Sequence, residues 1–237
     1  RVVSGLGWEY RTQPLTAYRH VEEGSTELAY VLGLLVAEGC PAHRDNASDG
    51  RIRISMIDPE PIDRLQRWAL GQQLRATRCV KAPQEQHHHE QHALDIAHHA
   101  DLYAAVAPRS AAKLVPAAVL NDQELWLPFL AGFLDGDGYV RTPRREIVLT
   151  TTSPYLQQLI AMLNGLGVSC YVWSARTGDS NPELAVCVSG DHASLLAGTL
   201  ARWVSIPYKR TALQELVLPR MRGTASEGYS CADVFVP

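Results

Sequence analysis

The longest apolar stretches of this chain are two runs that close in the same way. Residues 30–39 read YVLGLLVAEG and residues 130–138 read LAGFLDGDG, so each run ends in an acidic residue followed by glycine. Both runs are expected to be helices, which places each acid in a last helical turn. The negative end of the helix dipole lies there and disfavours an acid by up to about 1 kcal/mol. A cation between two such acids would reverse that cost.

Small residues recur at equivalent places within the two runs. Gly33 and Ala37 are four residues apart in the first run, and Gly132 and Gly136 repeat this spacing in the second. Small residues at that spacing let two helices approach each other closely. We therefore expect the first helix, over residues 25–38, to pack directly against the second.

The pattern that follows the first run is repeated after the second. Alternating polar and apolar residues predict strands, and an apolar period of three to four residues predicts helices. The closing glycines of the two runs are about one hundred residues apart, which indicates a tandem duplication. The expected strands are residues 51–56, 75–81, 91–97, a hairpin over 139–152, 168–175 and 183–189, and the expected helices begin near residues 25, 58, 99, 123, 153 and 191.

The chain therefore divides into two repeats with a segment on either side. Each repeat, residues 25–120 and residues 121–218, reads α-β-β-α-β-β-α, which is an α+β fold. Residues 1–24 lack a clear period and are expected to be an arm or linker. Residues 219–237 are expected to be a tail.

The composition of the chain indicates the cellular compartment in which the protein works. The chain has 237 residues, 46% of them hydrophobic, and its apolar runs fall short of the roughly 18 residues that cross a bilayer. No signal peptide is visible, and five scattered cysteines without a CxxC pair indicate free thiols in a reducing compartment. We expect a cytoplasmic protein with no membrane partner. The net charge of −3 disfavours a uniformly basic nucleic-acid binder, so a local basic face is expected instead.

At the two acidic runs the sequence resembles a known family. LAGFLDGDG resembles the signature of the LAGLIDADG homing endonucleases, and YVLGLLVAEG resembles a weaker first copy of it. The resemblance covers about residues 25–218 and implies two repeats related by a pseudo-twofold axis, with the two motif helices at their interface and a saddle-shaped surface of arginine-bearing sheets. It also implies a monomer that binds double-stranded DNA and hydrolyses both strands of a long, near-asymmetric site.

The resemblance assigns catalysis to the eighth position of each motif, which Glu38 and Asp137 occupy. It implies that each acid binds a divalent cation beside a scissile phosphate. Hard carboxylate ligands suit Mg²⁺, with Mn²⁺ or Ca²⁺ as substitutes in binding, and backbone carbonyls at Ala37 and Gly136 are candidate further ligands. Glutamate in place of aspartate moves the first carboxylate by one methylene, which predicts weaker cleavage of one strand.

Asp135 is expected to have a structural or helix-end role. It occupies the sixth position of its motif, where the first copy carries Val36, and valine cannot ligate a metal.

Two plainer interpretations of the second motif stay open. The sequence DGDG is typical of a surface turn. Asp135, Asp137 and Glu146 also fall at the first, third and twelfth positions of a calcium-binding loop, although Tyr139 and Val140 replace its fifth-position ligand and sixth-position glycine. For Glu38 the plainer interpretation is an ordinary surface acid.

Lys113 and Lys209 are candidate catalytic lysines. Each follows the last expected helix of its repeat, and the resemblance implies a lysine near the cleavage pocket from such a segment. A lysine there stabilises charge that develops on phosphate. The alternative is a solvated surface lysine.

The candidate DNA contacts are arginines on or beside the expected strands. Strands in the major groove can place such side chains on guanine edges or phosphates, although exposed strand faces are normally polar in any case. The set is Arg51, Arg53, Arg75, Arg78, Arg141, Arg144, Arg145 and Arg176.

Histidines form a separate cluster, at His87, His88, His89, His92, His98 and His99. Such a run can capture Zn²⁺ or Ni²⁺, but it lacks a spaced ligand set. A loop near DNA is the preferred interpretation.

Two further expectations concern origin and activity. Residues 232–237, ADVFVP, resemble the start of the C-terminal splicing block of inteins, whereas the chain begins at Arg1 and stops before a His-Asn pair. An endonuclease domain derived from an intein is therefore expected. The alternative to an endonuclease is a DNA- or RNA-binding relative that does not cleave, such as a maturase or a regulator. Glu38 and the acidic balance favour that alternative, and the intact second motif favours the enzyme.

Overall fold

The computed structural model describes residues 2–3, 9–10, 25–44, 47–82, 89–97, 100–106, 113–151, 155–174 and 184–218. Within these ranges no helix is long and apolar enough to cross a membrane. The expected tail, residues 219–237, lies outside them, and of the expected arm only the short strands β1 (Val2–Val3) and β2 (Glu9–Tyr10) are included.

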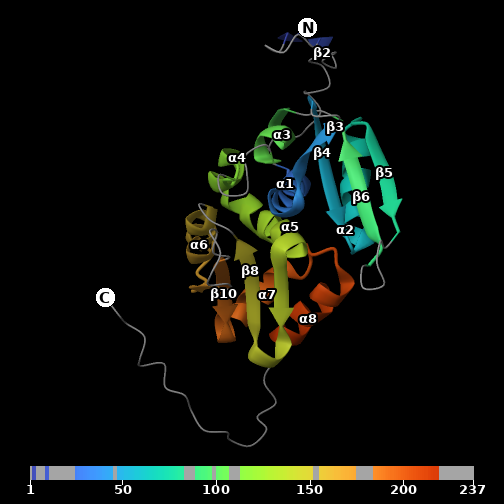
Figure 1. The fold of residues 1–237 in the computed structure, drawn as a ribbon. Helices are drawn as coiled ribbons and strands as arrows, with labels where there is room; N and C mark the ends of the chain where they lie inside the picture. The colour runs from blue at the N-terminus through green and yellow to red at the C-terminus, as the bar shows by residue number, and fades with distance from the viewer. Residues whose placement is uncertain are drawn as a thin grey trace, which may run out of the picture.

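Two apolar helices lie side by side at the centre of the molecule (Figure 1). These are α1, Thr26–Glu38, and α5, Trp126–Asp137, which follows the short 3-10 helix η3, Gln123–Leu125. The Ser25 hydroxyl caps α1 by accepting the N–H of Leu28 at 3.0 Å, so the helix predicted from Ser25 onward is confirmed.

The two helices approach each other backbone to backbone. A Cβ on Gly33 would lie 2.0 Å from the Phe129 carbonyl oxygen, and a Cβ on Gly132 would lie 2.0 Å from the Tyr30 carbonyl oxygen. The two contacts are equivalent under the repeat. The helix pair predicted from the small-residue spacing is therefore confirmed, and at both positions only glycine fits.

Each half of the chain contributes one four-stranded antiparallel sheet. The strands of the first sheet lie in the order β3-β4-β6-β5 and those of the second in the order β7-β8-β10-β9. Both sheets therefore follow the chain order first, second, fourth, third, as expected for a duplication. The strands are β3 (Cys40–Arg44), β4 (Ala47–Met56), β5 (Ala76–Lys81), β6 (Gln91–Ile96), β7 (Gly138–Arg141), β8 (Glu146–Thr151), β9 (Tyr171–Ser174) and β10 (Leu184–Ser189).

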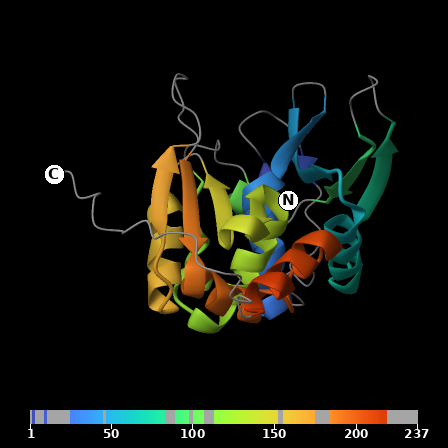
Figure 2. The ribbon, with the colours of Figure 1, turned by 90° about the horizontal axis from the view of Figure 1, so that it is seen from below.

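The remaining helices complete the two halves and pack mainly on one side of the sheets (Figure 2). They are α2 (Pro59–Gly71), α3 (Ala100–Val106), α4 (Ala117–Leu120), α6 (Tyr155–Gly165), α7 (Gly190–Leu200) and α8 (Pro207–Val217). Strand β3 and helix α8 were not expected from the sequence. The turn between β7 and β8 is another 3-10 helix, η4, Thr142–Arg144.

A hydrophobic core runs continuously through both repeats. It joins residues of the first sheet, such as Ile52 and Leu94, to residues of the second, such as Leu149 and Val186. The apolar face expected for α2 is also buried in this core, from Ile62 to Ala69. The two halves therefore fold around one core, and the motif helices lie where the halves join. The four described cysteines are free thiols, as expected.

Candidate functional site

Glu38 and Asp137 are the last residues of α1 and α5. The two helix ends touch, because a Cβ on Gly136 would lie 2.5 Å from the Ala37 Cβ and 3.1 Å from the Glu38 Cγ. Both acids are partly exposed. The close helix pair thus brings together the two acids that lie about one hundred residues apart in the sequence.

The two candidate lysines make matching contacts with these helix ends. The Lys113 ammonium donates to the carbonyl oxygens of Val36 and Gly39, both at 2.9 Å. The Lys209 ammonium donates to the carbonyl oxygens of Leu134 at 2.8 Å and Asp135 at 2.9 Å. The last carbonyls of a helix lack intrahelical partners and carry its negative pole. Each buried lysine therefore neutralises the end of one motif helix.

The lysines and the acids interact across the repeats. Burial lowers the pKa of Lys113, and among the neighbouring carboxylates Asp137 of the other repeat opposes this most. Burial likewise lowers the pKa of Lys209, and Asp135, Asp58, Glu38 and Asp137 oppose it. Burial raises the pKa of Glu38, whereas Lys209 and Lys113 act to lower it. Each lysine therefore interacts electrostatically with both acids.

Asp135 has the structural role expected for the sixth position. Its carboxylate is 1% exposed and accepts three hydrogen bonds, from the Tyr30 hydroxyl at 2.7 Å, the Ser205 N–H at 2.7 Å and the Ile206 N–H at 3.4 Å. Burial raises its pKa, and the bonds from Ser205 and Tyr30 oppose that shift. Asp135 thus ties α1 to the segment that opens α8, the helix that carries Lys209.

Arg64 extends this network and was not among the residues predicted from the sequence. Its guanidinium pairs with Glu27 at 2.7 and 2.6 Å, donates to the Trp203 carbonyl at 2.5 Å, and lies 3.5 Å from the centre of the Tyr30 ring. Its partners in the second repeat lie nearly 140 residues further along the chain, so local sequence patterns cannot reveal the contact.

The oxygen atoms at the two helix ends suit an open magnesium site better than a metal site enclosed by protein ligands. In the described part of the chain, no three His, Cys, Asp or Glu side chains gather closely enough to hold a metal. Two carboxylates are present, and Ala37 and Gly136 lie in last helical turns, where carbonyls have no intrahelical partner. Mg²⁺ commonly takes one or two carboxylates and completes its shell with water and phosphate oxygens.

The plainer interpretations of the second motif do not hold. DGDG ends a helix and is not a surface turn. The calcium-loop alternative fails because the Asp135 carboxylate is buried against Tyr30 and Ser205, while Glu146 lies on β8 and accepts bonds from Arg141 and Tyr171.

The histidine cluster is only partly described, because His87, His88, His98 and His99 lie outside the described residues. His92 pairs with Glu90 at 3.5 Å and lies 3.2 Å from Arg78.

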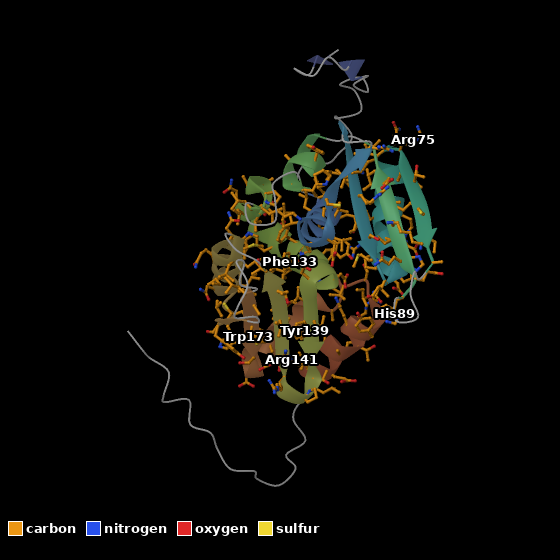
Figure 3. All side chains as sticks on the ribbon, viewed as in Figure 1. Arg75, His89, Phe133, Tyr139, Arg141 and Trp173 are labelled. Atoms are coloured by element: carbon orange, nitrogen blue, oxygen red, sulfur yellow. The ribbon has the colours of Figure 1, made fainter. Side chains whose placement is uncertain are left out.

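Two predicted arginines lie on the open face of the first sheet. Arg51 and Arg53 alternate along β4 with the buried Ile52 and Ile54. Arg75 lies next to β5 and is exposed, near one end of the sheet (Figure 3). Arg78 points to the other side of the sheet, where it pairs with Asp63 of α2, so the open face does not include it.

The second sheet presents a different surface. The Arg141 guanidinium lies 4.8 Å from the centre of the Tyr139 ring and 5.5 Å from that of Trp173, and all three side chains gather on the sheet in Figure 3. Arg144 is exposed in the turn. Arg145 is drawn toward the helices, since it donates to the Ser194 hydroxyl and, at 2.6 Å, to the Leu216 carbonyl. Arg176 lies outside the described residues.

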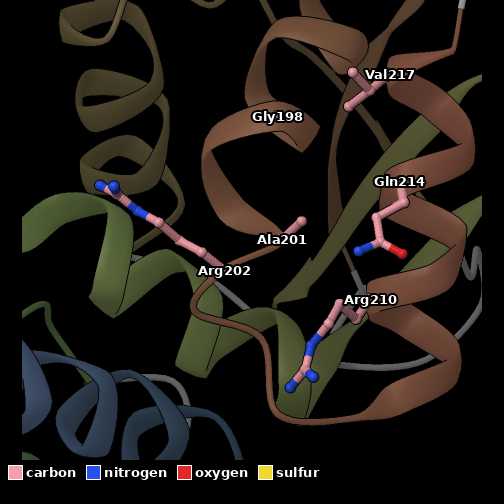
Figure 4. A pocket seen from close by; sticks show the side chains of 6 residues that line it. All are labelled: Gly198, Ala201, Arg202, Arg210, Gln214 and Val217. Carbon is pink, nitrogen blue, oxygen red and sulfur yellow. The ribbon is translucent and has the colours of Figure 1, made fainter.

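A pocket of about 640 Å³ lies between α7 and α8 (Figure 4). Its lining includes Arg202, Arg210 and Gln214 but none of the predicted catalytic side chains. The candidate site is therefore separate from this pocket and lies at the partly exposed junction of the two helix ends.

Comparison with known proteins identifies the fold. Residues 125–197 match the LAGLIDADG-like domain family, whereas no curated protein sequence matches significantly. Among solved structures, the chain is similar to I-DmoI in complex with DNA and Ca, with 16% identity, a TM-score of 0.58 and coverage of 81% of this chain and 99% of the other. The chain is also similar to the homing endonuclease I-WcaI bound to its DNA recognition sequence, with 12% identity, a TM-score of 0.60 and coverage of 88% of this chain and 95% of the other.

The similarity is not confined to endonucleases. Full-length DUF199/WhiA from Thermatoga maritima is 14% identical, with a TM-score of 0.57 and coverage of 92% of this chain and 69% of the other. At such identities the likeness shows the fold alone. Residues 125–197 are thus similar to the LAGLIDADG-like domain family, and over most of its length the chain has the fold of the LAGLIDADG homing endonucleases.

Proposed function

We propose that this chain is a site-specific, divalent-metal-dependent endodeoxyribonuclease that cuts both strands of a long DNA site. One observation carries the proposal: Glu38 and Asp137 are the last residues of two helices whose ends touch. Two buried lysines fix those helix ends. An arrangement that served only stability would not place two acids at the unfavourable ends of adjacent helices.

The residues divide the chemistry between them. Glu38 and Asp137, with the carbonyls of Ala37 and Gly136, would hold Mg²⁺, which when bound activates water and neutralises charge on the leaving oxygen. Lys113 and Lys209 keep positive charge beside the carboxylates and stabilise the charge that develops on phosphate. Structures of I-DmoI with DNA contain Ca, Mn or Mg, which supports the choice of a divalent cation.

The two sheets would bind the duplex on either side of the cleavage site. Both acids and both sheets belong to one chain, so we propose that it acts as a monomer. The half-buried Arg51 and Arg53 and the exposed Arg75 and Arg144 would supply local positive charge on the sheets despite the net charge of −3. I-WcaI bound to its DNA recognition sequence has the same fold, which supports duplex DNA as the substrate. A cytoplasmic location and an intein origin stay predictions.

The second candidate is a DNA- or RNA-binding protein of the same fold that does not cleave. Glu38 favours it, because the residue is longer than the aspartate of the second motif and burial raises its pKa. The similarity to DUF199/WhiA also supports this second candidate, because the name of that protein does not denote an endonuclease.

Cleavage of a randomised duplex library separates the two candidates. The unmodified chain is incubated with Mg²⁺ or with a chelator, and both ends of every cut duplex are sequenced. A Glu38→Gln/Asp137→Asn double variant is the matched control, because each change removes a charge and keeps the side-chain size. The endonuclease proposal expects cutting at a defined sequence that requires both the metal and the acids. Retention of a preferred sequence without any cutting would establish the non-cleaving candidate instead.

A further inference from the structure

The hydrogen-bond register aligns the open faces of the two sheets position by position. In both sheets the residue after the closing glycine of the motif lies in the first strand, Cys40 in β3 and Tyr139 in β7. The equivalent rows across the sheets are Cys40, Arg53, Asp95 and Thr77 in the first, and Tyr139, Val148, Cys187 and Tyr171 in the second. An ion pair on the first sheet thus corresponds to two apolar side chains on the second.

The ion pair has a defined geometry. The Arg53 Nε donates to Asp95 Oδ1 and the Arg53 Nη2 donates to Asp95 Oδ2, both at 2.6 Å. Such a two-bond pair fixes the plane and direction of the guanidinium. The hydrogen bond that Arg53 donates to Asp95 is also the main reason that the pKa of Arg53 is raised, so the side chain stays charged.

The outer edge of the Arg53 guanidinium points away from Asp95. A guanidinium has five N–H donors in one plane, and Asp95 engages two of them. The donors on Nη1, and the second one on Nη2, therefore face outward from the pair. The Arg53 side chain is 42% exposed, and the buried neighbours Ile52 and Ile54 hold its backbone in the sheet.

We propose that Arg53, held in place by Asp95, reads a guanine in the major groove of the half-site that lies on the first sheet. Two parallel donors from arginine match the O6 and N7 acceptors of guanine, the commonest specific contact in that groove. Asp95 is a positioning residue, because it orients the guanidinium without touching the base. This inference rests on the proposed DNA binding. It adds that one base in the half-site on the first sheet is a guanine.

The second sheet does not repeat this arrangement. Val148 and Cys187 are buried beneath Tyr139 and Trp173. The nearby Arg141 uses Nη2 to bond the Tyr139 hydroxyl at 2.7 Å and Nη1 to bond Glu146 at 3.4 Å, while its face lies over two rings. The guanine preference is therefore expected on one side of the target only.

Binding selection on a randomised duplex library tests the inference. The full chain carries Glu38→Gln and Asp137→Asn, so that bound duplexes are not cut, and retained duplexes are sequenced. Arg53→Lys keeps the charge but loses the two-donor edge, and it should reduce the preference for guanine at one position by about tenfold. Asp95→Asn should reduce the same preference while non-specific binding rises, because a negative charge is removed. Arg67→Lys is the matched control and should change neither, because Arg67 is exposed on α2, on the other side of the sheet.

A second measurement changes the DNA base instead of the protein contact. The selected guanine is replaced by 7-deazaguanine, which lacks the N7 acceptor, and affinity should fall about tenfold for the parent chain but not for the Arg53→Lys chain. Equal affinity of the parent chain for both duplexes, or an unchanged base preference in Arg53→Lys, would overturn the inference while DNA binding stands. Failure of the parent chain to retain any duplex would overturn the proposed DNA binding itself.

Discussion

The two motif helices end alike in one respect and differently in another. At both ends a buried lysine donates to the carbonyl of the sixth motif position, Val36 in the first and Asp135 in the second. The Asp135 side chain, however, bonds Tyr30 and the start of α8, whereas Val36 is buried in the apolar core. The shared lysine contact lies at the candidate site. The contacts that differ lie where the two repeats pack together. The two repeats thus share the lysine contact and differ in the contacts behind it.

The largest expected effect on stability comes from adding a methyl group where the backbones of α1 and α5 are in contact. Gly33→Ala and Gly132→Ala would each place a methyl group 2.0 Å from a backbone carbonyl oxygen of the other helix. Each should lower the free energy of unfolding by about 3 kcal/mol or more, measured by urea denaturation. Gly71→Ala on α2 is the matched control, since nothing lies within 4 Å of its added Cβ. Unequal costs at the two glycines would break the pseudo-symmetry of the helix pair.

The second largest effect on stability is expected from the hydrogen bonds of Asp135, which the first repeat lacks. Asp135→Ala would leave the Tyr30 hydroxyl and the Ser205 N–H without their shared acceptor, and should lower the free energy of unfolding by about 2–3 kcal/mol. Tyr30→Phe should cost about 1 kcal/mol. Because the two groups bond each other, the double variant should cost less than the sum. Strict additivity in chemical denaturation would argue against a shared network.

The raised pKa of Glu38 makes one helix end sensitive to pH. A raised pKa means that the folded chain holds this proton more tightly, so stability falls as pH rises from about 4.5 through the pKa of the folded chain. Under the proposed function Mg²⁺ would bind the ionised carboxylate, so the rise in melting temperature caused by Mg²⁺ should grow across the same window. Glu38→Gln should remove this pH dependence, and Asp137→Asn should retain it. A Glu38→Gln chain with an unchanged pH profile would contradict the assignment.

The smallest expected effect on stability concerns the ion pair on the first sheet. Arg53 and Asp95 are 42% and 23% exposed, and exposed pairs contribute less than about 1 kcal/mol. Asp95→Asn should therefore leave the thermal unfolding profile nearly unchanged. A loss of more than about 2 kcal/mol would mean that the pair supports the sheet and would weaken its proposed role in base reading.

Local patterns predicted the parts of the fold that depend on local chemistry. The glycine spacing predicted the helix pair, Pro59 marked the start of α2, and alternation along β4 placed Arg53 on the open face. Strand β3 escaped prediction because Pro41 is unfavourable inside a strand, and it lies on the sheet edge. Helix α8 escaped because only Lys209, Leu213 and Leu216 of its eleven residues are buried, which leaves a weak apolar period.

The orientation of individual arginines required the register between strands. Arg78 was grouped with DNA-facing residues, but its neighbours Thr77 and Cys79 occupy the open face and leave it on the side of α2. Arg145 has a left-handed backbone with φ of 54°, which follows the turn and lets its side chain reach α8. Neither orientation follows from residue type or spacing within one segment.

Strand-specific nicking tests the central claim, that each motif acid serves one strand. The cleavage site selected from the library is placed in a supercoiled plasmid, and the two strands are labelled separately. The account predicts that Glu38→Gln and Asp137→Asn each leave nicked circles, with opposite strands intact. Loss of cutting on both strands in equal measure, or full cutting by either variant, would contradict the pairing of one acid with one strand.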